Sequence, residues 1–168
     1  CSSDLPRTIQ SVSSSLNMEY LDKITEQVGI NSKSYHLLNE HVSDNKVMSN
    51  MKSRGYVIVN MGSMWGPNMG FAGVDVNLCE FKQINSNSLM NELLLSSMLG
   101  YIQERFTEQG RRDGILCTFD ELYTINKKIP KQKFVFAHIQ LPHSPFIFGP
   151  NGEHVTPGIP LNSSKWDE

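Results

Sequence analysis

Three polar side chains lie where helices or strands are expected to begin or end: Thr8, His138 and His143. Thr8 opens a periodic apolar segment, and the two histidines lie where an apolar run at 134–139 leads into a proline-rich loop. A hydroxyl at the amino end of a helix feels the positive end of the helix dipole, which is worth about 0.3–1 kcal/mol and favours an alkoxide or a bound anion. A threonine nucleophile also needs a divalent cation, because coordination lowers the pKa of a hydroxyl.

Each of these positions also has a purely structural interpretation. A threonine at a helix start commonly caps the helix, and a histidine at a strand end is commonly a hydrogen-bonded structural residue. His138 and His143 flank Pro142 and do not share a helix face. The remaining histidines, His36, His41 and His154, add no metal-ligand spacing. Spacing alone therefore predicts no metal cluster.

Hydrophobic periodicity predicts the elements that must position these side chains. Apolar residues at steps of three or four predict helices over 8–28, 34–51, 88–106 and 113–125. Gly55 is expected to end the second helix in a left-handed conformation. The apolar runs 56–61 and 134–139 predict two buried strands.

The glycine-rich segment 62–73 follows the first of these strands and is predicted to be a loop. In open α/β sheets, ligands bind at the carboxyl ends of the strands, which is where this loop starts. Helices that alternate with apolar strands predict an α/β layered fold.

Length and composition limit the function classes. The 168 residues, of which 39% are hydrophobic, are enough for one domain or for part of a larger one. With 15 basic and 17 acidic residues the net charge is -2, so nucleic acid is not an expected partner. The longest apolar runs are shorter than the roughly 20 residues that span a bilayer. The abrupt ends at Cys1 and Glu168 predict an internal piece of a longer protein.

The three cysteines, Cys1, Cys79 and Cys117, contain no C-x-x-C pair. This argues against a zinc ribbon and against a disulfide-rich scaffold, and it leaves one bridge possible.

Three motifs follow one another along nearly the whole chain. They are T-I-Q-S-V-S-S-S-L-N-M-E-Y-L at 8–21, R-G-Y at 54–56 with N-M-G-S-M-W-G at 60–66, and F-V-F-A-H-I-Q-L-P-H-S-P-F-I-F at 134–148. Together they resemble sulfatase-like proteins of the alkaline phosphatase superfamily, especially the membrane-anchored archaeal and bacterial kind. The resemblance implies an incomplete alkaline phosphatase-like three-layer α/β/α sandwich, in which residues 1–168 form the central part of one catalytic domain.

The resemblance also implies roles for individual residues. Thr8 matches the nucleophile, which in this superfamily is also a metal ligand, and His143 matches the histidine that contacts the substrate ester. His138 and Trp65 fall within the matching motifs as substrate-binding candidates. The cofactor would be a divalent metal ion (Mn, Mg, Zn or Ca), with most of its ligands outside this chain.

The implied function is a metal-dependent hydrolase or transferase that acts on phosphate or sulfate esters through a covalent threonine intermediate. Its substrate would be a small-molecule ester or one linked to a lipid or glycan. By the same resemblance, the parent protein is expected to be membrane-anchored with its catalytic domain outside the cytoplasm, and this piece itself to be soluble.

The chain departs from classical sulfatases at two motifs. Where they carry C/S-x-P-x-R and mature the Cys or Ser to formylglycine, this chain has Thr8 followed by I-Q-S-V. Where they carry G-K-W-H, this chain has G-S-M-W at 62–65. A threonine nucleophile is instead typical of lipoteichoic acid synthases and phosphoethanolamine transferases. Two alternatives remain: a sulfatase without the modified residue, and a non-catalytic module that holds a glycan or protein with the loop bearing Trp65 and Phe71.

Overall fold

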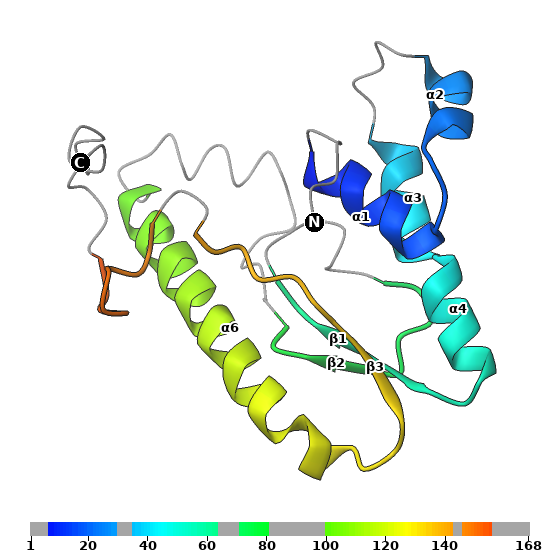
Figure 1. The fold of residues 1–168 in the computed structure, drawn as a ribbon. Coiled ribbons are helices and arrows are strands. Elements are labelled where there is room, and N and C mark those ends of the chain that lie inside the picture. Colours follow the sequence, from blue (N-terminus) through cyan, green and yellow to red (C-terminus); the bar gives the residue numbers. More distant parts are fainter. Residues whose placement is uncertain (1–6, 30–34, 64–70, 81–99, 143–145, 156–168) are drawn as a thin grey trace.

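A computed structural model of the chain describes residues 7–29, 35–63, 71–80, 100–142 and 146–155 (Figure 1). Within these ranges the strands form one parallel sheet in the order β2-β1-β3. The strands are β1 (Val57–Met61), β2 (Val76–Leu78) and β3 (Lys133–Ala137). The two predicted strands are thus confirmed, and the protein is a mixed α/β structure, as the alternation of helices and strands predicts.

The single helix predicted over residues 8–28 is wrong, because the segment forms α1 (Thr8–Asn17) and α2 (Asp22–Val28). α1 ends where Met18 adopts a left-handed conformation with φ of 53°. The buried side chain of Asn17 donates hydrogen bonds to the carbonyls of Ser13 and His41 and accepts one from the N–H of Lys46. The bonds to His41 and Lys46 replace the next helical turn, and Tyr20, four residues after the buried Leu16, is 85% exposed.

The helix predicted over residues 34–51 is also divided, into α3 (His36–Ser43) and α4 (Lys46–Ser53). Asn45 causes the division, since its side-chain oxygen accepts a hydrogen bond of 2.9 Å from the N–H of Met48 and so caps α4. Gly55 follows α4 with φ of 84°, which confirms the predicted left-handed cap.

The two later predicted helices contribute to one helix, α6 (Gly100–Lys128). Residues 88–99 of the first prediction lie outside the described residues, whereas 100–106 and 113–125 are continuous in α6. The gap expected between them, at residues 107–112, does not occur. Strand β2 was not predicted, because its three residues carry too little pattern to identify a strand.

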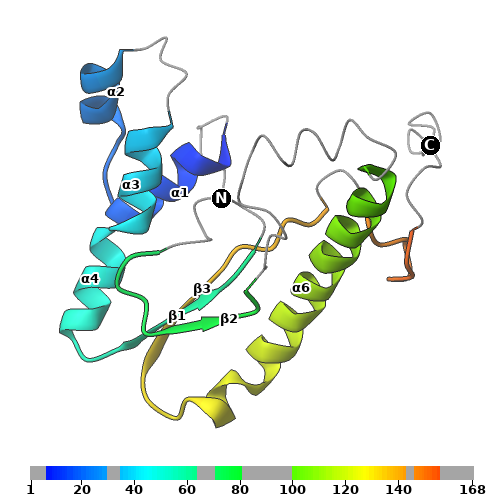
Figure 2. The same ribbon diagram turned by 180° about the vertical axis from the view of Figure 1, so that it is seen from behind.

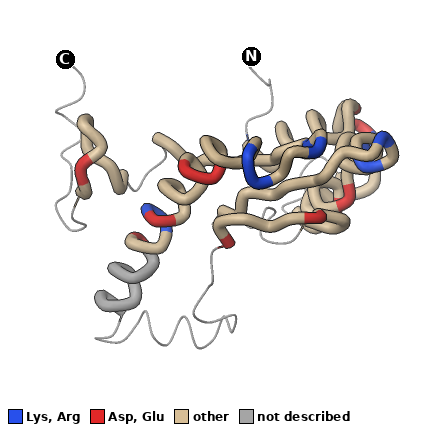
Figure 3. The backbone as a smooth tube through the Cα atoms, turned by 90° about the horizontal axis from the view of Figure 1, so that it is seen from below, with Lys and Arg blue, Asp and Glu red and all other residues tan. Residues whose placement is uncertain are grey.

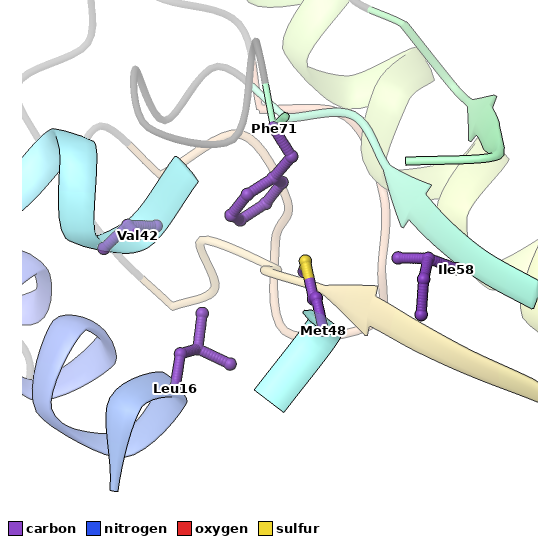
Figure 4. Close-up of a cluster of buried hydrophobic side chains, with 5 residues drawn as sticks. All are labelled: Leu16, Val42, Met48, Ile58 and Phe71. Carbon is purple, nitrogen blue, oxygen red and sulfur yellow. The ribbon is translucent and has the colours of Figure 1, made fainter. Parts of the chain in front are cut away.

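Helices cover both faces of the sheet, as two opposite views show (Figures 1 and 2). On one face, α1, α3, α4 and β1 contribute to a buried cluster of Leu16, Val42, Met48, Ile58 and Phe71 (Figure 4). On the other face, Val59 and Met61 of β1 pack with Ile125 of α6. Alternate residues of β1 thus face opposite layers, which explains why this strand is apolar on both sides.

Phe71 belongs to the core of the first face. Its ring meets that of Phe136 edge-on, with the centroids 4.9 Å apart, and the residue is 8% exposed. This contradicts a role for Phe71 in holding a glycan or protein, while Trp65 lies outside the described residues. Among the helices of the described ranges, none is long and apolar enough to cross a membrane.

Candidate functional site

A small cavity lies where the carboxyl ends of the strands meet helix α6. Its volume is about 20 Å³, roughly the space that a water-sized group occupies. From the strand ends it is lined by Gly62 and Ser63 after β1, Cys79 after β2 and His138 after β3. Arg111 and Gly114 line it from α6. The cavity is therefore at the edge of the parallel sheet where α/β proteins commonly bind ligands.

Two structural features bring these elements together. The N–H of Gly62 donates a hydrogen bond of 2.7 Å to the carbonyl of Leu78, and a Cβ at Gly62 would lie 2.8 Å from the carbonyl oxygen of Cys79. Only glycine allows so close an approach between the two backbones. A disulfide between Cys79 and Cys117, with Cα atoms 5.8 Å apart, ties the end of β2 to α6. The sequence allows one disulfide among its three cysteines, and the structure shows that it joins Cys79 to Cys117.

His138 follows directly on β3 and lines the cavity. It is half-buried, and burial lowers the pKa of its imidazole below the ordinary value, because a charged ring is poorly solvated there. At neutral pH the ring is thus uncharged, with one nitrogen that donates and one that accepts.

The lowered pKa of His138 predicts a pH dependence of stability. The unfolded chain binds the proton of His138 more readily than the folded chain does. The contribution of His138 to the free energy of unfolding is therefore fully present above about pH 6.5, and it is lost as the pH falls toward the lower pKa of the folded state. We expect the free energy of unfolding of the wild type, measured by urea titration from pH 7.5 to 5, to decrease more than that of His138→Gln. If the free energy of unfolding changes equally with pH in the two proteins, folding does not shift the pKa of His138.

The carboxyl groups with shifted pKa values do not interfere with that comparison. The pKa of Glu19 is lowered by its hydrogen bond from Lys46, and that of Asp75 by its hydrogen bond from the N–H of Ile58. Their stabilisation is lost only as the pH falls below about 4.5, the ordinary value for glutamate. Between pH 7.5 and 5, these two carboxyl groups therefore do not contribute to the difference in unfolding free energy between the wild type and His138→Gln.

Thr8 is the exposed first residue of α1. Arg7, not Thr8, occupies the N-cap position, and its side chain makes no capping bond. The Arg7 carbonyl accepts hydrogen bonds of 3.1 Å from the N–H groups of Gln10 and Ser11, and its guanidinium lies 5.2 Å from the centre of the Tyr35 ring. The Thr8 hydroxyl is thus at the amino end of a helix and follows Arg7 in the sequence, and a helix amino end favours an anion.

The first turn of α1 faces the carboxyl side of the sheet (Figures 1 and 2). Ile9, the residue after Thr8, packs on the same buried cluster as Phe136 of β3, which fixes the position of this turn. Thr8 does not line the cavity, because α1 and α6 cover opposite faces of the sheet.

The structure thus places two of the four predicted site residues. Thr8 and His138 are described, and they lie on different sides of the sheet edge. His143 and Trp65 lie outside the described residues.

A metal centre does not form from the described part of the chain alone. Over those residues, no group of three or more His, Cys, Asp and Glu side chains could hold a metal ion. Basic and acidic residues are interspersed along the described elements (Figure 3), so an anion would be held by a local arrangement rather than by a broad positive field.

Comparison with known proteins assigns no family. No family model matches the chain, and neither curated proteins nor solved structures match it. The site must be interpreted from its own residues.

Sequence reasoning missed the arginines of α6. Arg111 lines the cavity, and the guanidinium of its neighbour Arg112 lies 4.5 Å from the centre of the Phe148 ring and donates a hydrogen bond of 3.4 Å to the Gly152 carbonyl. The two contacts of Arg112 hold the segment that follows the P-H-S-P motif against α6. Arg111, Gly114 and Thr118 lie three or four residues apart in α6 and all line the cavity, but Arg111 falls between the helices predicted over 88–106 and 113–125.

Proposed function

We propose that this chain is the central part of a sulfatase-like catalytic domain of the alkaline phosphatase superfamily, a metal-dependent hydrolase or transferase of phosphate or sulfate esters. The observation that carries the proposal is the exposed Thr8 at the amino end of α1, beside Arg7 and facing the carboxyl side of a parallel sheet. The three motifs that resemble this family supply the reaction class, and the helix-covered parallel sheet is compatible with it.

In the proposed reaction Thr8 forms a covalent intermediate. Its Oγ1 loses its proton and attacks phosphorus, the bond to the ester oxygen breaks, and the departing alkoxide takes up a proton and leaves as an alcohol. Water or an acceptor alcohol then attacks the phosphothreonine and restores the hydroxyl. His143 contacts the ester oxygens, and His138 and Trp65 contribute to substrate binding. The exposure of Thr8 favours this role, because its hydroxyl is accessible to an ester.

The metal of this proposal is a divalent ion, Mn, Mg, Zn or Ca. Among the described residues only Thr8 is proposed as a ligand, and no acidic or histidine cluster accompanies it there. The described residues therefore do not amount to a metal site, and the remaining ligands are proposed to lie outside this chain.

The disulfide supports an oxidising compartment. Bridges such as Cys79–Cys117 form and persist outside the cytoplasm and are rare within it. We therefore place the proposed catalytic domain on the extracytoplasmic side, in a membrane-anchored parent protein whose substrate is a small, lipid-linked or glycan-linked ester.

A trapped adduct tests the proposal. The parent protein, loaded with Mn²⁺ and mixed with an aryl phosphate, is quenched in acid, digested and analysed by mass spectrometry. We expect the mass of one phosphoryl group on the peptide that contains Thr8, with fragment ions that assign it to Thr8 rather than to the serines Ser11, Ser13, Ser14 and Ser15. An adduct on one of those serines would contradict Thr8 as the nucleophile, whereas an aryl sulfate that reacts faster than the phosphate would identify sulfate esters as the substrate class.

A further inference from the structure

We propose that the end of the sheet where the strands begin carries a docking surface for a membrane that contains anionic phospholipids. This basic surface consists of Arg54, Lys127, Lys131 and Lys133, and the exposed Tyr123 of α6 lies beside it. It is at the opposite ends of the strands from the cavity, so a bilayer bound here does not cover the cavity. The proposal rests on charge and exposure, and it needs neither Thr8 nor turnover.

The fold brings these charges together from two distant segments of the chain. Strands β1 and β3 pair in parallel with Val57 opposite Lys133, and the N–H of Val57 donates a hydrogen bond of 2.9 Å to the carbonyl of Gln132. The residues that precede the two strands are therefore neighbours. Helix α6 ends at Lys128 on the same side of the molecule (Figures 1 and 2). Arg54, just after α4, thus shares this side with the lysines at and after the end of α6.

Acidic side chains do not neutralise the basic surface. The sequence has no Asp or Glu from residue 122 to residue 152, a segment that contains four lysines. Two further basic residues nearby are already paired, Lys128 with Glu121 and Lys52 with Asp75. Within the described parts of the chain, no carboxylate forms an ion pair with any member of the basic surface. Their charges are therefore available to an external anion.

The helix dipole explains only part of this cluster. Basic residues in the last turn of a helix interact favourably with its dipole, which accounts for Lys127 in α6 and Lys52 in α4. Lys131 and Lys133 follow Pro130, beyond the last turn of α6, where the effect of the dipole has fallen off. An anionic partner accounts for these two lysines as well.

Exposed apolar side chains favour a lipid surface over other polyanions. Leu116, Phe119 and Tyr123 follow one another on α6 at steps of three and four, and they are 42%, 51% and 87% exposed. Tyr123 lies one turn before Lys127, so an aromatic ring and a positive charge share one face of the helix. Basic and aromatic residues together are typical of helices at the headgroup region, where the ring enters the apolar boundary and the lysines meet anionic headgroups. A nucleic-acid backbone offers the negative charge but no apolar layer.

Vesicle binding by the 168-residue chain tests the proposal. The probes are vesicles of equal parts phosphatidylglycerol and phosphatidylcholine, and vesicles of phosphatidylcholine alone, each sedimented with the protein at low salt. We expect binding to the anionic vesicles only, and we expect added salt to weaken it. Each basic residue near an anionic surface strengthens binding about fivefold, so Lys127→Gln/Lys131→Gln should bind about 25-fold more weakly than the wild type.

Two other lysines provide the matched control. Lys23→Gln/Lys46→Gln removes the same charge from α2 and from the first residue of α4, away from the basic surface, and should bind the anionic vesicles like the wild type. Lys127 and Lys131 are exposed, and within the described structure their side chains make no hydrogen bond or ion pair. Urea unfolding of Lys127→Gln/Lys131→Gln should therefore match the wild type, which separates weaker binding from damage to the fold.

Tyr123→Ser tests the choice of a lipid partner. This variant should also bind the anionic vesicles more weakly, because the ring no longer enters the apolar boundary. Equal affinities of the two double lysine variants, or equal binding of the wild type to neutral and anionic vesicles, would overturn the proposal. Displacement of the protein from the vesicles by duplex DNA, with unchanged vesicle binding in Tyr123→Ser, would identify a nucleic-acid site instead. Because none of these measurements involves turnover, their failure leaves the proposed function standing, and a missing Thr8 adduct leaves the docking surface standing.

Discussion

The double variant Cys79→Ser/Cys117→Ser is expected to lose about 4 kcal/mol of unfolding free energy. The bridge joins residues 38 positions apart, and the chain-entropy relation for a loop of that length gives this value at 25 °C. The bridge also anchors the three-residue strand β2, whose following residue, Cys79, has a left-handed φ of 56°. A non-glycine residue in that region costs about 1–2 kcal/mol, so without the cross-link the end of β2 is free to relax away from α6.

Urea unfolding monitored by circular dichroism measures this loss. With a slope of about 2 kcal/mol per M, the midpoint should fall by about 2 M. Cys1→Ser is the matched control, because it removes a thiol and leaves the bridge intact. If the double variant and the control unfold at the same urea concentration, the bridge does not stabilise the protein in solution.

Strands β1 and β3 were predictable because their residue types and the boundaries that flank them indicate a buried strand. In β1 the apolar run is β-branched, follows the left-handed Gly55 and packs on both faces. In β3 it is aromatic and β-branched and begins shortly after Pro130. Short, mostly apolar runs between such boundaries favour parallel strands in a sheet covered on both sides, whichever helices cover it.

The helix boundaries were not predictable, because side chains distant in the sequence determine them. Asn17 ends α1 by bonding to the carbonyl of His41 and the N–H of Lys46, residues that a periodic pattern cannot connect to it. Asn45 divides α3 from α4 by capping. The gap predicted at residues 107–112 is absent, since α6 continues through Gly110, a residue type that commonly ends helices.

The candidate site was predictable only where a residue stands at the end of an element. His138 was identified because it follows an apolar run, and the structure places it on the cavity wall. The pairing of Cys79 with Cys117 depends on how β2 meets α6, which the spacing of three cysteines cannot specify. Arg111 was not identified because it falls between the two helices predicted at 88–106 and 113–125, and its place on the cavity wall depends on how α6 meets the strand ends.

Replacing Thr8 by Ala is expected to lower turnover of phosphate esters by the proposed parent protein about a thousandfold or more, because loss of the proposed covalent nucleophile would leave only binding and electrostatic effects. Thr8→Ser keeps a hydroxyl and should retain measurable turnover. Thr25→Ala is the matched control, since Thr25 is also an exposed helical threonine but belongs to α2.

The same substitution should leave the fold unchanged, which makes the activity loss interpretable. Thr8 is exposed, and within the described residues its side chain makes no capping bond or other hydrogen bond, so the change in unfolding free energy should stay within about 0.5 kcal/mol. Kinetics and urea unfolding of Thr8→Ala, measured on one preparation, separate the two effects. Full turnover in that variant removes Thr8 from the mechanism. A loss of turnover with unchanged stability identifies the hydroxyl itself as the reacting group, because the first turn of α1 remains anchored by Ile9 on the core.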